Sequence, residues 1–309
     1  MRPQLHQLEY FVAVAEDRHF TRAAERLHVA QPSVSAQIRQ LERTLGTQLF
    51  HRAPGKVSLT DAGELLLPLA RRALADVEEL VDGVADLDSL QRGRVAIGAT
   101  PSLSTTLLPA ALSRFHQRHP GVALAVTEQG SRRLVDGLES GELDVALAIL
   151  PLHQPLLDSV TLAIEELVVV TSADHPLAAR RRIEIADLSQ VPLVMFRDGY
   201  DLKTVTLSVC HQAGFEPVVA LEGGEMDGVL ALVGAGLGAA IVPSIVASAH
   251  PDLHRLRVRS LSFRREIGLV HRGDRPLSRA AAALSAEITG LLAGRGWPSR
   301  PPPGLQLTV

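Results

Sequence analysis

The chain has 309 residues, more than one average domain, which predicts two or three folded units. Hydrophobic residues make up 46% of the chain and charged residues 21%, a globular composition that excludes an intrinsically disordered protein. The single cysteine, Cys210, excludes an intramolecular disulfide and fits a reducing compartment. The first 20 residues lack the apolar core of a signal peptide, and no apolar run is long enough to span a bilayer. We therefore expect a cytoplasmic protein.

The net charge of -3 is distributed unevenly along the chain. Residues 1–60 carry 8 Lys or Arg against 5 Asp or Glu, whereas residues 61–92 carry 3 against 8. Only the first segment is basic, so a polyanion is expected to bind at that end of the chain.

Three helices are predicted in the first 46 residues. Apolar residues recur at steps of three and four between Leu5 and Ala15, which indicates a first helix. Thr21 is placed to cap a second helix that runs to Leu27, and Pro32 fits the first turn of a third helix that Gly46 ends. The third helix has apolar positions at steps of 4, 3 and 4, which we expect to pack inward: Val34, Ile38, Leu41 and Leu45.

The opposite face of this third helix is small, polar and cationic. Its members are Pro32, Ser33, Ala36, Arg39, Gln40 and Arg43. Ser and Gln side chains hydrogen-bond base edges in a major groove, and Arg side chains bind phosphates. The alternative is an ordinary solvated face of a helical bundle.

The same region resembles the DNA-binding signature of LysR-type transcription regulators. The resemblance is carried by residues 8–11, 20–35, 37–42, 45–46, 49–50 and by Arg52. It implies a winged helix-turn-helix with these DNA-binding residues: Thr21, Arg22, Gln31, Pro32, Ser33, Ser35, Ala36 and Arg39 on the helices, and Pro54, Gly55 and Lys56 on the wing. Ala36 departs from the family, in which a longer polar side chain is common, so one base contact is expected to be missing.

A long linker helix is predicted for residues 61–92, opened by Thr60 and Asp61. Apolar residues at alternating steps of 4 and 3 form a coiled-coil seam: Leu66, Ala70, Ala73, Val77, Leu80, Val84 and Leu87. This pattern favours pairing of two chains, and a core helix within one chain is the alternative. A dimer also supplies the second recognition helix that specific DNA binding needs.

From residue 93 onward, short β-rich runs alternate with amphipathic helices, the pattern of an α/β domain. The expected strands are 94–97, 124–126, 145–149, 167–170, 238–242 and 267–270. Phrases at 95–98, 108–109, 119–122, 141–146 and 233–238 resemble the effector domain of the same family.

The resemblance implies two lobes like those of periplasmic binding proteins. The whole chain is then an α+β multidomain protein with an all-α winged helix-turn-helix, a linker helix and a two-lobed α/β domain. Its predicted domains are 1–60, 61–92 and 93–294, with lobe I at 93–163 and 266–294, lobe II at 164–265, and a disordered Pro-rich tail at 295–309. The resemblance further implies a homodimer or homotetramer that binds double-stranded DNA and changes the access of RNA polymerase.

A small-molecule effector, of which a carboxylate is one candidate, is expected in the cleft between the lobes. Thr100, Pro101 and Ser102 follow the first strand and open the next helix, where N–H groups and hydroxyls face a cleft. By the family pattern, the second side of the cleft comprises Phe196, Arg197, Tyr200, Lys203, Met226 and Val242. Arg197 is a candidate partner for a carboxylate, although a surface cation is the commoner role of a single Arg.

Within the family, residues 198–203 resemble the peroxide-sensing branch, which has a reactive Cys where this chain has Asp201. The second Cys of that branch would match Cys210. A disulfide switch needs two thiols, so this chain cannot use that mechanism, and we interpret Cys210 as a buried structural thiol.

None of the remaining motifs indicates an enzyme. The glycines of 234–238 read as a helix-to-strand turn rather than a dinucleotide loop, and the His116/His119 and His250/His254 pairs lack further metal ligands. We expect no cofactor, no metal and no catalytic residue. The alternatives are a solute-binding or transport-associated α/β module, which would need a secretion signal, and a metabolite-binding enzyme.

Overall fold

The computed structural model describes residues 2–53, 56–85, 93–259, 263–292 and 303–308. The chain divides into two compact units, the first made of residues 1–89 and 137–143 and the second of residues 90–136 and 144–309. Within the described ranges, no helix combines the length and apolar character that crossing a membrane requires.

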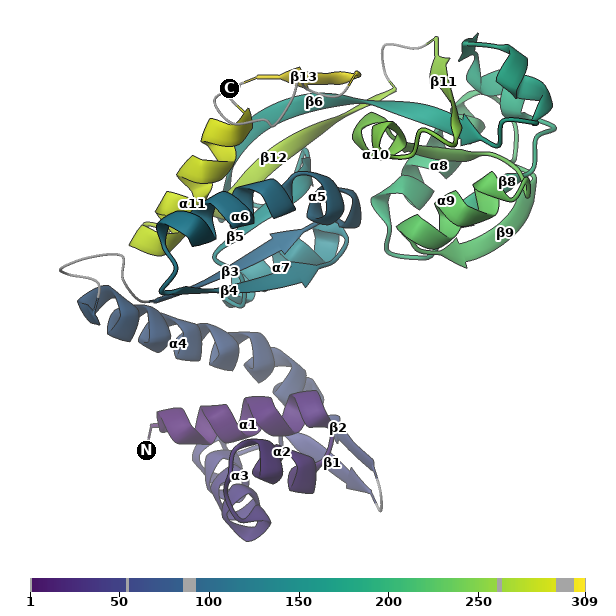
Figure 1. The fold of residues 1–309 in the computed structure, drawn as a ribbon. Coiled ribbons are helices and arrows are strands. Elements are labelled where there is room, and N and C mark those ends of the chain that lie inside the picture. Colours follow the sequence, from purple (N-terminus) through teal and green to yellow (C-terminus); the bar gives the residue numbers. More distant parts are fainter. Residues whose placement is uncertain (1, 54–55, 86–92, 260–262, 293–302, 309) are drawn as a thin grey trace. The chain divides into compact units, whose positions relative to one another are not determined.

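The first unit opens with three helices, α1 (Leu5–Asp17), α2 (Phe20–Arg26) and α3 (Gln31–Leu45), as the sequence predicts (Figure 1). The core is made by one face of each helix, and its fully buried members include Phe11, Val14, Ala23, Val34, Ile38 and Leu41. Gly46 ends α3 in the left-handed conformation (φ 71°), which glycine adopts without steric cost.

Two details of the helix predictions are wrong. Thr21 does not cap α2, because the ring Nδ1 of His19 accepts hydrogen bonds from the backbone N–H groups of Thr21 and Arg22 (3.2 and 3.5 Å). Leu45 is 40% exposed rather than inward-facing, because the buried contacts of α3 end at Leu41.

A two-stranded wing and a long helix complete the first unit. Strand β1 (Phe50–Ala53) pairs antiparallel with β2 (Lys56–Leu59). Phe50 anchors the wing, since its ring lies 5.4 Å from Phe11 and 5.8 Å from Phe20 between centroids. Helix α4 (Asp61–Ala85) follows, and the Thr60 hydroxyl accepts a hydrogen bond from the Gly63 N–H (3.1 Å).

The predicted coiled-coil seam of α4 is only partly free to pair with another chain. Leu66 and Ala70 pack into the core of the first unit, and Ala70 is 1% exposed. Farther along, Leu80 is 65% exposed. Leu87 lies outside the described residues. The beginning of α4 is therefore a core helix, the alternative reading of this segment.

The second unit is an α/β structure with two lobes. Its main sheet has the strand order β4-β3-β5-β12-β6-β11-β7, and β10 and β13 also pair with β6. Lobe I contains β3 (Gly93–Ala99), α5 (Pro101–Thr106), α6 (Leu108–Arg118), β4 (Val122–Glu128), α7 (Ser131–Ser140), β5 (Val145–Leu150) and α11 (Arg279–Gly290). Lobe II contains β7 (Arg182–Ile183), β8 (Leu193–Phe196), α8 (Asp201–Gln212), β9 (Val219–Gly224), α9 (Met226–Gly234), β10 (Ala240–Pro243), α10 (Ser244–Ala249) and β11 (His254–Val258).

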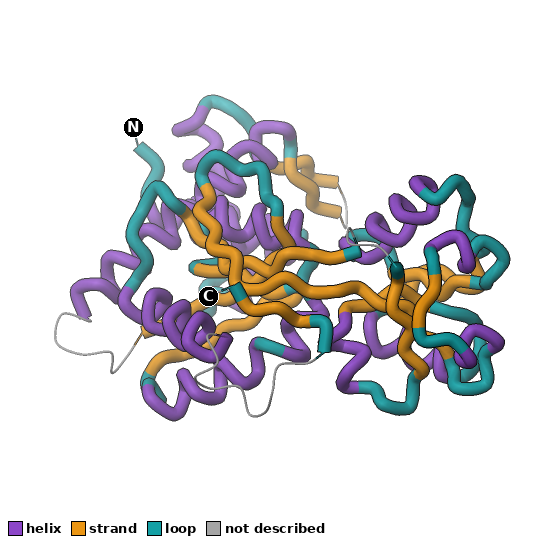
Figure 2. The backbone as a smooth tube through the Cα atoms, turned by 90° about the horizontal axis from the view of Figure 1, so that it is seen from above, coloured by secondary structure: helices purple, strands orange, loops and turns teal. Residues whose placement is uncertain are grey.

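Two strands run from one lobe to the other. The 15-residue β6 (Leu157–Thr171) and β12 (Arg264–Arg272) pair antiparallel, and Figures 1 and 2 show both extending from lobe I toward lobe II. The six strands expected from the sequence all fall within or overlap observed strands, and residues 235–239 form the predicted helix-to-strand turn between α9 and β10.

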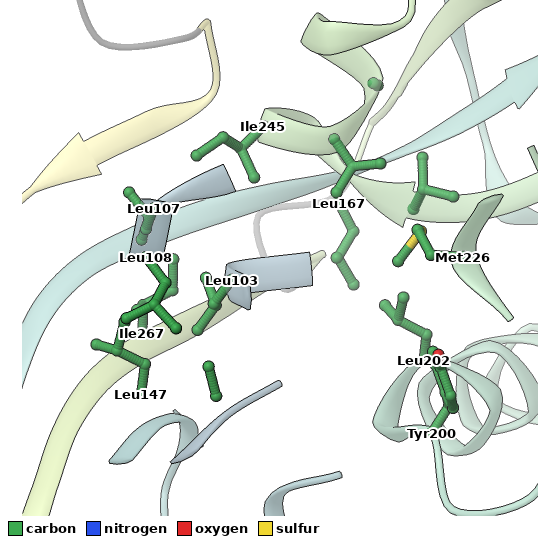
Figure 3. Packing of buried hydrophobic residues seen from close by; sticks show 14 of the residues in the cluster. Leu103, Leu107, Leu108, Leu147, Leu167, Tyr200, Leu202, Met226, Ile245 and Ile267 are labelled. Atoms are coloured by element: carbon green, nitrogen blue, oxygen red, sulfur yellow. The ribbon is translucent and has the colours of Figure 1, made fainter. Parts of the chain in front are cut away.

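A single apolar core extends through both lobes. Figure 3 shows Leu103 and Ile267 on the lobe I side and Tyr200 and Met226 on the lobe II side, with Leu167 of β6 between the two groups. This shared core positions the loops that follow β3 and β8.

The end of the chain is more ordered than the sequence analysis expected. Residues 305–307 form β13, which pairs antiparallel with β6 at residues 163–165. The Glu166 N–H donates to the Gly304 carbonyl (2.8 Å), and the Thr308 N–H donates to the Leu162 carbonyl (3.0 Å). Leu305 and Leu307 supply the apolar contacts that a disordered tail lacks. Residues 295–302 and 309 of the predicted tail lie outside the described residues.

Removing residues 304–309 is expected to lower the stability of the second unit by about 2 kcal/mol, because two half-buried leucines and the pairing with β6 are lost. The measurement is thermal or urea unfolding of the full chain against the truncated chain. Gln306→Ala, which changes only an exposed side chain of β13, serves as the control. Equal unfolding midpoints for the truncated and parent chains would show that β13 contributes nothing.

Candidate nucleic-acid interface and effector site

The outer face of α3 is exposed, as its residue pattern predicts. Five of the six candidate contact residues of this helix are exposed, namely Gln31, Pro32, Ser33, Ala36 and Arg39, and Ser35 is half-buried. The Gln31 side-chain amide donates to the Ser35 hydroxyl at 2.9 Å. No acidic residue lies in the first turn of α3, so the helix itself places no carboxylate at its positive dipole end.

The orientation of α3 is fixed by a polar contact that sequence reasoning missed. The buried Gln7 of α1 donates from its amide to the Gln37 side-chain oxygen (3.0 Å), and the same oxygen lies 3.2 Å from the His6 ring. These three polar residues gave no signal in the sequence, because their pairing joins two helices across about 30 residues.

The remaining candidate DNA contacts lie at the start of α2 and on the wing. Thr21 and Arg22 are exposed, and the Arg22 guanidinium donates to the Asp17 carbonyl. Lys56 is the first residue of β2. Pro54 and Gly55, the predicted wing tip, lie outside the described residues.

A buried ion pair joins β6 and β12, the two paired strands that run from one lobe to the other. Glu165 of β6 is fully buried and accepts two hydrogen bonds on Oε2 from the Arg265 guanidinium of β12 (2.9 and 2.8 Å). Its Oε1 accepts from the Ile245 N–H (2.8 Å), and Arg265 also donates to the Ser102 hydroxyl (2.9 Å). Neither charge was among the predicted site residues, because the pairing becomes visible only once β6 and β12 are in register.

A small cavity of about 10 Å³ adjoins this ion pair. Five of the predicted effector residues line it, namely Thr100, Pro101, Ser102, Tyr200 and Met226. Gly130, Asp201, Leu202 and Arg265 complete its lining. The Thr100 hydroxyl is buried and has no hydrogen-bond partner among the described residues. The volume suffices for about one water molecule, so an organic ligand fits only if the lobes separate.

The other predicted effector residues lie elsewhere. Phe196 is buried in the core, where its ring stacks on Tyr200 at 5.4 Å, and Val242 is buried in β10. Arg197 donates to the Glu225 carboxylate (2.9 Å) and lies over the Tyr200 ring (4.8 Å). Lys203 pairs with Asp198 and with Glu222. The hydrogen bonds to these two carboxylates raise the pKa of Lys203, so it stays charged.

Asp201 links the two lobes directly. Its carboxylate accepts a hydrogen bond from the hydroxyl of Ser131 (2.6 Å) at the start of α7, and its Oδ2 lies 3.4 Å from the Ser131 N–H. The Ser131 hydroxyl in turn accepts from the Ile149 N–H (3.3 Å). Asp201 thus anchors the start of α8 to the end of β5 through one serine.

Cys210 is a buried thiol in α8, as interpreted from the sequence. Burial, with a smaller contribution from Glu216, raises the pKa of the Cys210 thiol to about 11. The thiol is therefore protonated at neutral pH, a state in which it is a poor nucleophile. Across the described residues, no group of three or more His, Cys, Asp or Glu side chains is arranged to hold a metal ion.

Two family models match the chain. Residues 5–64 match the bacterial regulatory helix-turn-helix protein, lysR family, and residues 88–293 match the LysR substrate binding domain. Together they cover both units of the fold.

Curated relatives and solved structures agree with these matches. The chain is 33% identical over 295 residues to the DNA-binding transcriptional dual regulator OxyR of Escherichia coli strain K12, covering 93% of this chain and 96% of the relative. A full-length OxyR variant from Pseudomonas aeruginosa superposes with a TM-score of 0.74 at 26% identity, covering 97% of this chain and all of that one. CbnR in complex with its target DNA gives a TM-score of 0.68 at 27% identity, over 92% of this chain and 98% of that one.

Asp201→Ala is expected to loosen the lobes, because a hydrogen bond to a charged group contributes about 1.5–3 kcal/mol. The measurement is hydrogen exchange in the full chain, in which the amides of Ser131 and Ile149 should exchange faster than in the parent. Asp198→Ala is the matched control, since it removes an exposed carboxylate of the same loop that binds only Lys203. Unchanged exchange at both amides would rule out the link.

Cys210 is expected to react with iodoacetamide far more slowly in the native chain than in the urea-unfolded chain, because the native thiol is buried and protonated. Alkylation followed by mass spectrometry at pH 8 measures both rates. The unfolded chain also acts as the control for reagent and pH. Comparable rates in the two states would contradict the raised pKa.

Proposed function

Because the chain belongs to the LysR family of bacterial transcriptional regulators, we propose that α3 reads base edges in the major groove of a specific operator. The observation that carries this proposal is the division of α3 into two faces. One face is fully buried at Val34, Ile38 and Leu41, and the other presents hydroxyl, amide and guanidinium groups to solvent. The buried face fixes the orientation of the exposed one.

Ser33 and Ser35 are proposed as base-reading residues near the amino end of α3, and Arg39 as a phosphate contact. Thr21 and Arg22 of α2 and Pro54, Gly55 and Lys56 of the wing are proposed to position the unit on the DNA backbone. Ala36 offers only a methyl group, which suits contact with a thymine methyl rather than a hydrogen bond.

The proposed domain organisation places DNA binding at 1–60, dimerisation at 61–92 and effector binding at 93–294. Supporting pairing of two chains, Leu65, Leu69 and Leu80 are exposed on α4. Such large apolar side chains are stabilised when a second copy covers them. Two copies would present two recognition helices to two half-sites.

The cavity between the lobes is proposed as the effector site, with Thr100, Ser102 and Arg265 as hydrogen-bonding groups and Tyr200 and Met226 as walls. The unpartnered Thr100 hydroxyl supports this assignment. An effector would bind there only with the lobes apart, so it favours the open arrangement by its differential affinity.

We propose a regulator that acts in the cytoplasm, where bacterial operators lie, and that performs no turnover of its effector. The support is the family to which both units belong. Phe196, Arg197, Lys203 and Val242 are proposed to support the site from behind rather than to contact the effector.

Ser35→Ala is expected to weaken binding to the intergenic region beside the protein's own gene by roughly 5- to 100-fold, because a base contact contributes about 1–3 kcal/mol. Binding to scrambled DNA should change little. Fluorescence anisotropy at fixed salt measures both affinities. Thr47→Ala, which removes an exposed hydroxyl beyond the end of α3, is the control. An equal loss on both DNAs for Ser35→Ala would exclude base reading by this residue.

A further inference from the structure

A second cavity, far larger than the one between the lobes, lies in lobe II beside the crossing strands. Its volume is about 340 Å³, within the range of small-molecule sites. Four arginines line it, Arg182 of β7, Arg257 of β11, Arg259 just after β11, and Arg264 of β12. We call it the arginine pocket.

The sheet holds these arginines close together. Arg257 lies directly opposite Arg182 in the parallel pairing of β11 with β7, so both side chains leave the sheet on one face. Arg264 lies opposite Glu166 in the pairing of β12 with β6. The pocket is built on paired strands, so the backbone positions of these exposed arginines stay close together.

The carboxylates around the pocket are too few to neutralise the positive charge of its four arginines. Glu166 is the one carboxylate in its described lining, and its contacts are long, 3.6 Å to Arg264 and 4.0 Å to Arg257. Asp187 lies near Arg259 but hydrogen-bonds to Arg180 (3.1 Å). Among the described residues, no hydrogen bond or ion pair joins the side chains of Arg182 or Arg259 to a partner. Like charges opposite one another destabilise a sheet, so this arrangement lowers stability unless an anion is bound.

The walls of the pocket add an apolar component. Phe263 is buried, and its carbonyl accepts a hydrogen bond from the Leu167 N–H (3.0 Å), which fixes the end of β12 against β6. Phe263 and Leu167 both line the pocket. A ligand that fits has anionic groups for the guanidinium forks and a short carbon skeleton against these two side chains.

We propose that the arginine pocket binds a small organic anion with two or more negative charges, carried by carboxylate or phosphate groups. This site is separate from the cavity between the lobes and does not depend on DNA binding. It contacts β6 and β12, the strands that run between the lobes, and β12 also contributes Arg265 to the lining of the effector cavity.

The test uses the full chain without DNA and two probes, citrate and glycerol 3-phosphate. Both should raise the unfolding temperature saturably, beyond the effect of sodium chloride at matched ionic strength, and acetate should not. Arg182→Gln and Arg257→Gln should each weaken citrate binding in titration calorimetry by about tenfold or more, since each removes a charged hydrogen-bonding partner. Arg132→Gln, at an exposed arginine of α7, is the matched control and should leave citrate binding unchanged.

A second readout separates a lost site from a damaged fold. Without added anion, Arg182→Gln should unfold at the same temperature as the parent or higher, because the repulsion with Arg257 is relieved. The proposal is overturned if neither probe exceeds the salt control, or if both arginine variants bind citrate as the parent does. It is also overturned if only a large polyanion such as heparin gives an effect that these variants remove, which would assign the arginines to a macromolecular partner.

Discussion

The buried pair of Glu165 and Arg265 is the constraint on which the two-lobed unit depends. Transfer of these charges out of water is costly, and only complete hydrogen bonding offsets it. Glu165 therefore also accepts from the Ile245 N–H, and Arg265 also donates to Ser102. Removing one partner would leave the other charge buried and unpaired, a loss of about 3–5 kcal/mol. The pair thus holds β6 and β12 in register.

The presence of Asp201 in place of a reactive cysteine limits how the two-lobed unit of this chain can be switched. A thiol at this position alters its bonding when it is oxidised, whereas a carboxylate has no comparable redox chemistry and here accepts a hydrogen bond from Ser131. The lobes of this chain are therefore joined by a contact that redox chemistry does not change. A ligand can switch such a unit only if it binds the open and closed arrangements with different affinity, since equal affinity shifts no population.

The sequence predicted local structure well and long-range contacts poorly. Periodicity placed α1 and α3, because burial in α3 recurs at Val34, Ile38 and Leu41 with the helical period, whereas strands such as β3 were recognised as short apolar runs. Residues 100–102 were placed at the cavity, because the loop after a parallel strand has a known position. The Glu165–Arg265 pair, the Asp201–Ser131 bond and β13 were missed, since each joins segments 70 or more residues apart. Such pairings leave no periodic signal in a single sequence.

The two cationic regions of the chain differ in what holds their charges. On α3, Arg39 and Arg43 are a full helical turn apart and exposed, and Arg39 can turn toward water or a phosphate. In the arginine pocket, Arg182 and Arg257 are also exposed, but they leave the same face of the sheet at opposed backbone positions. Hydration by solvent is sufficient to stabilise the charges of Arg39 and Arg43. The second arrangement places two like charges opposite each other, a repulsion that the proposed anion would relieve.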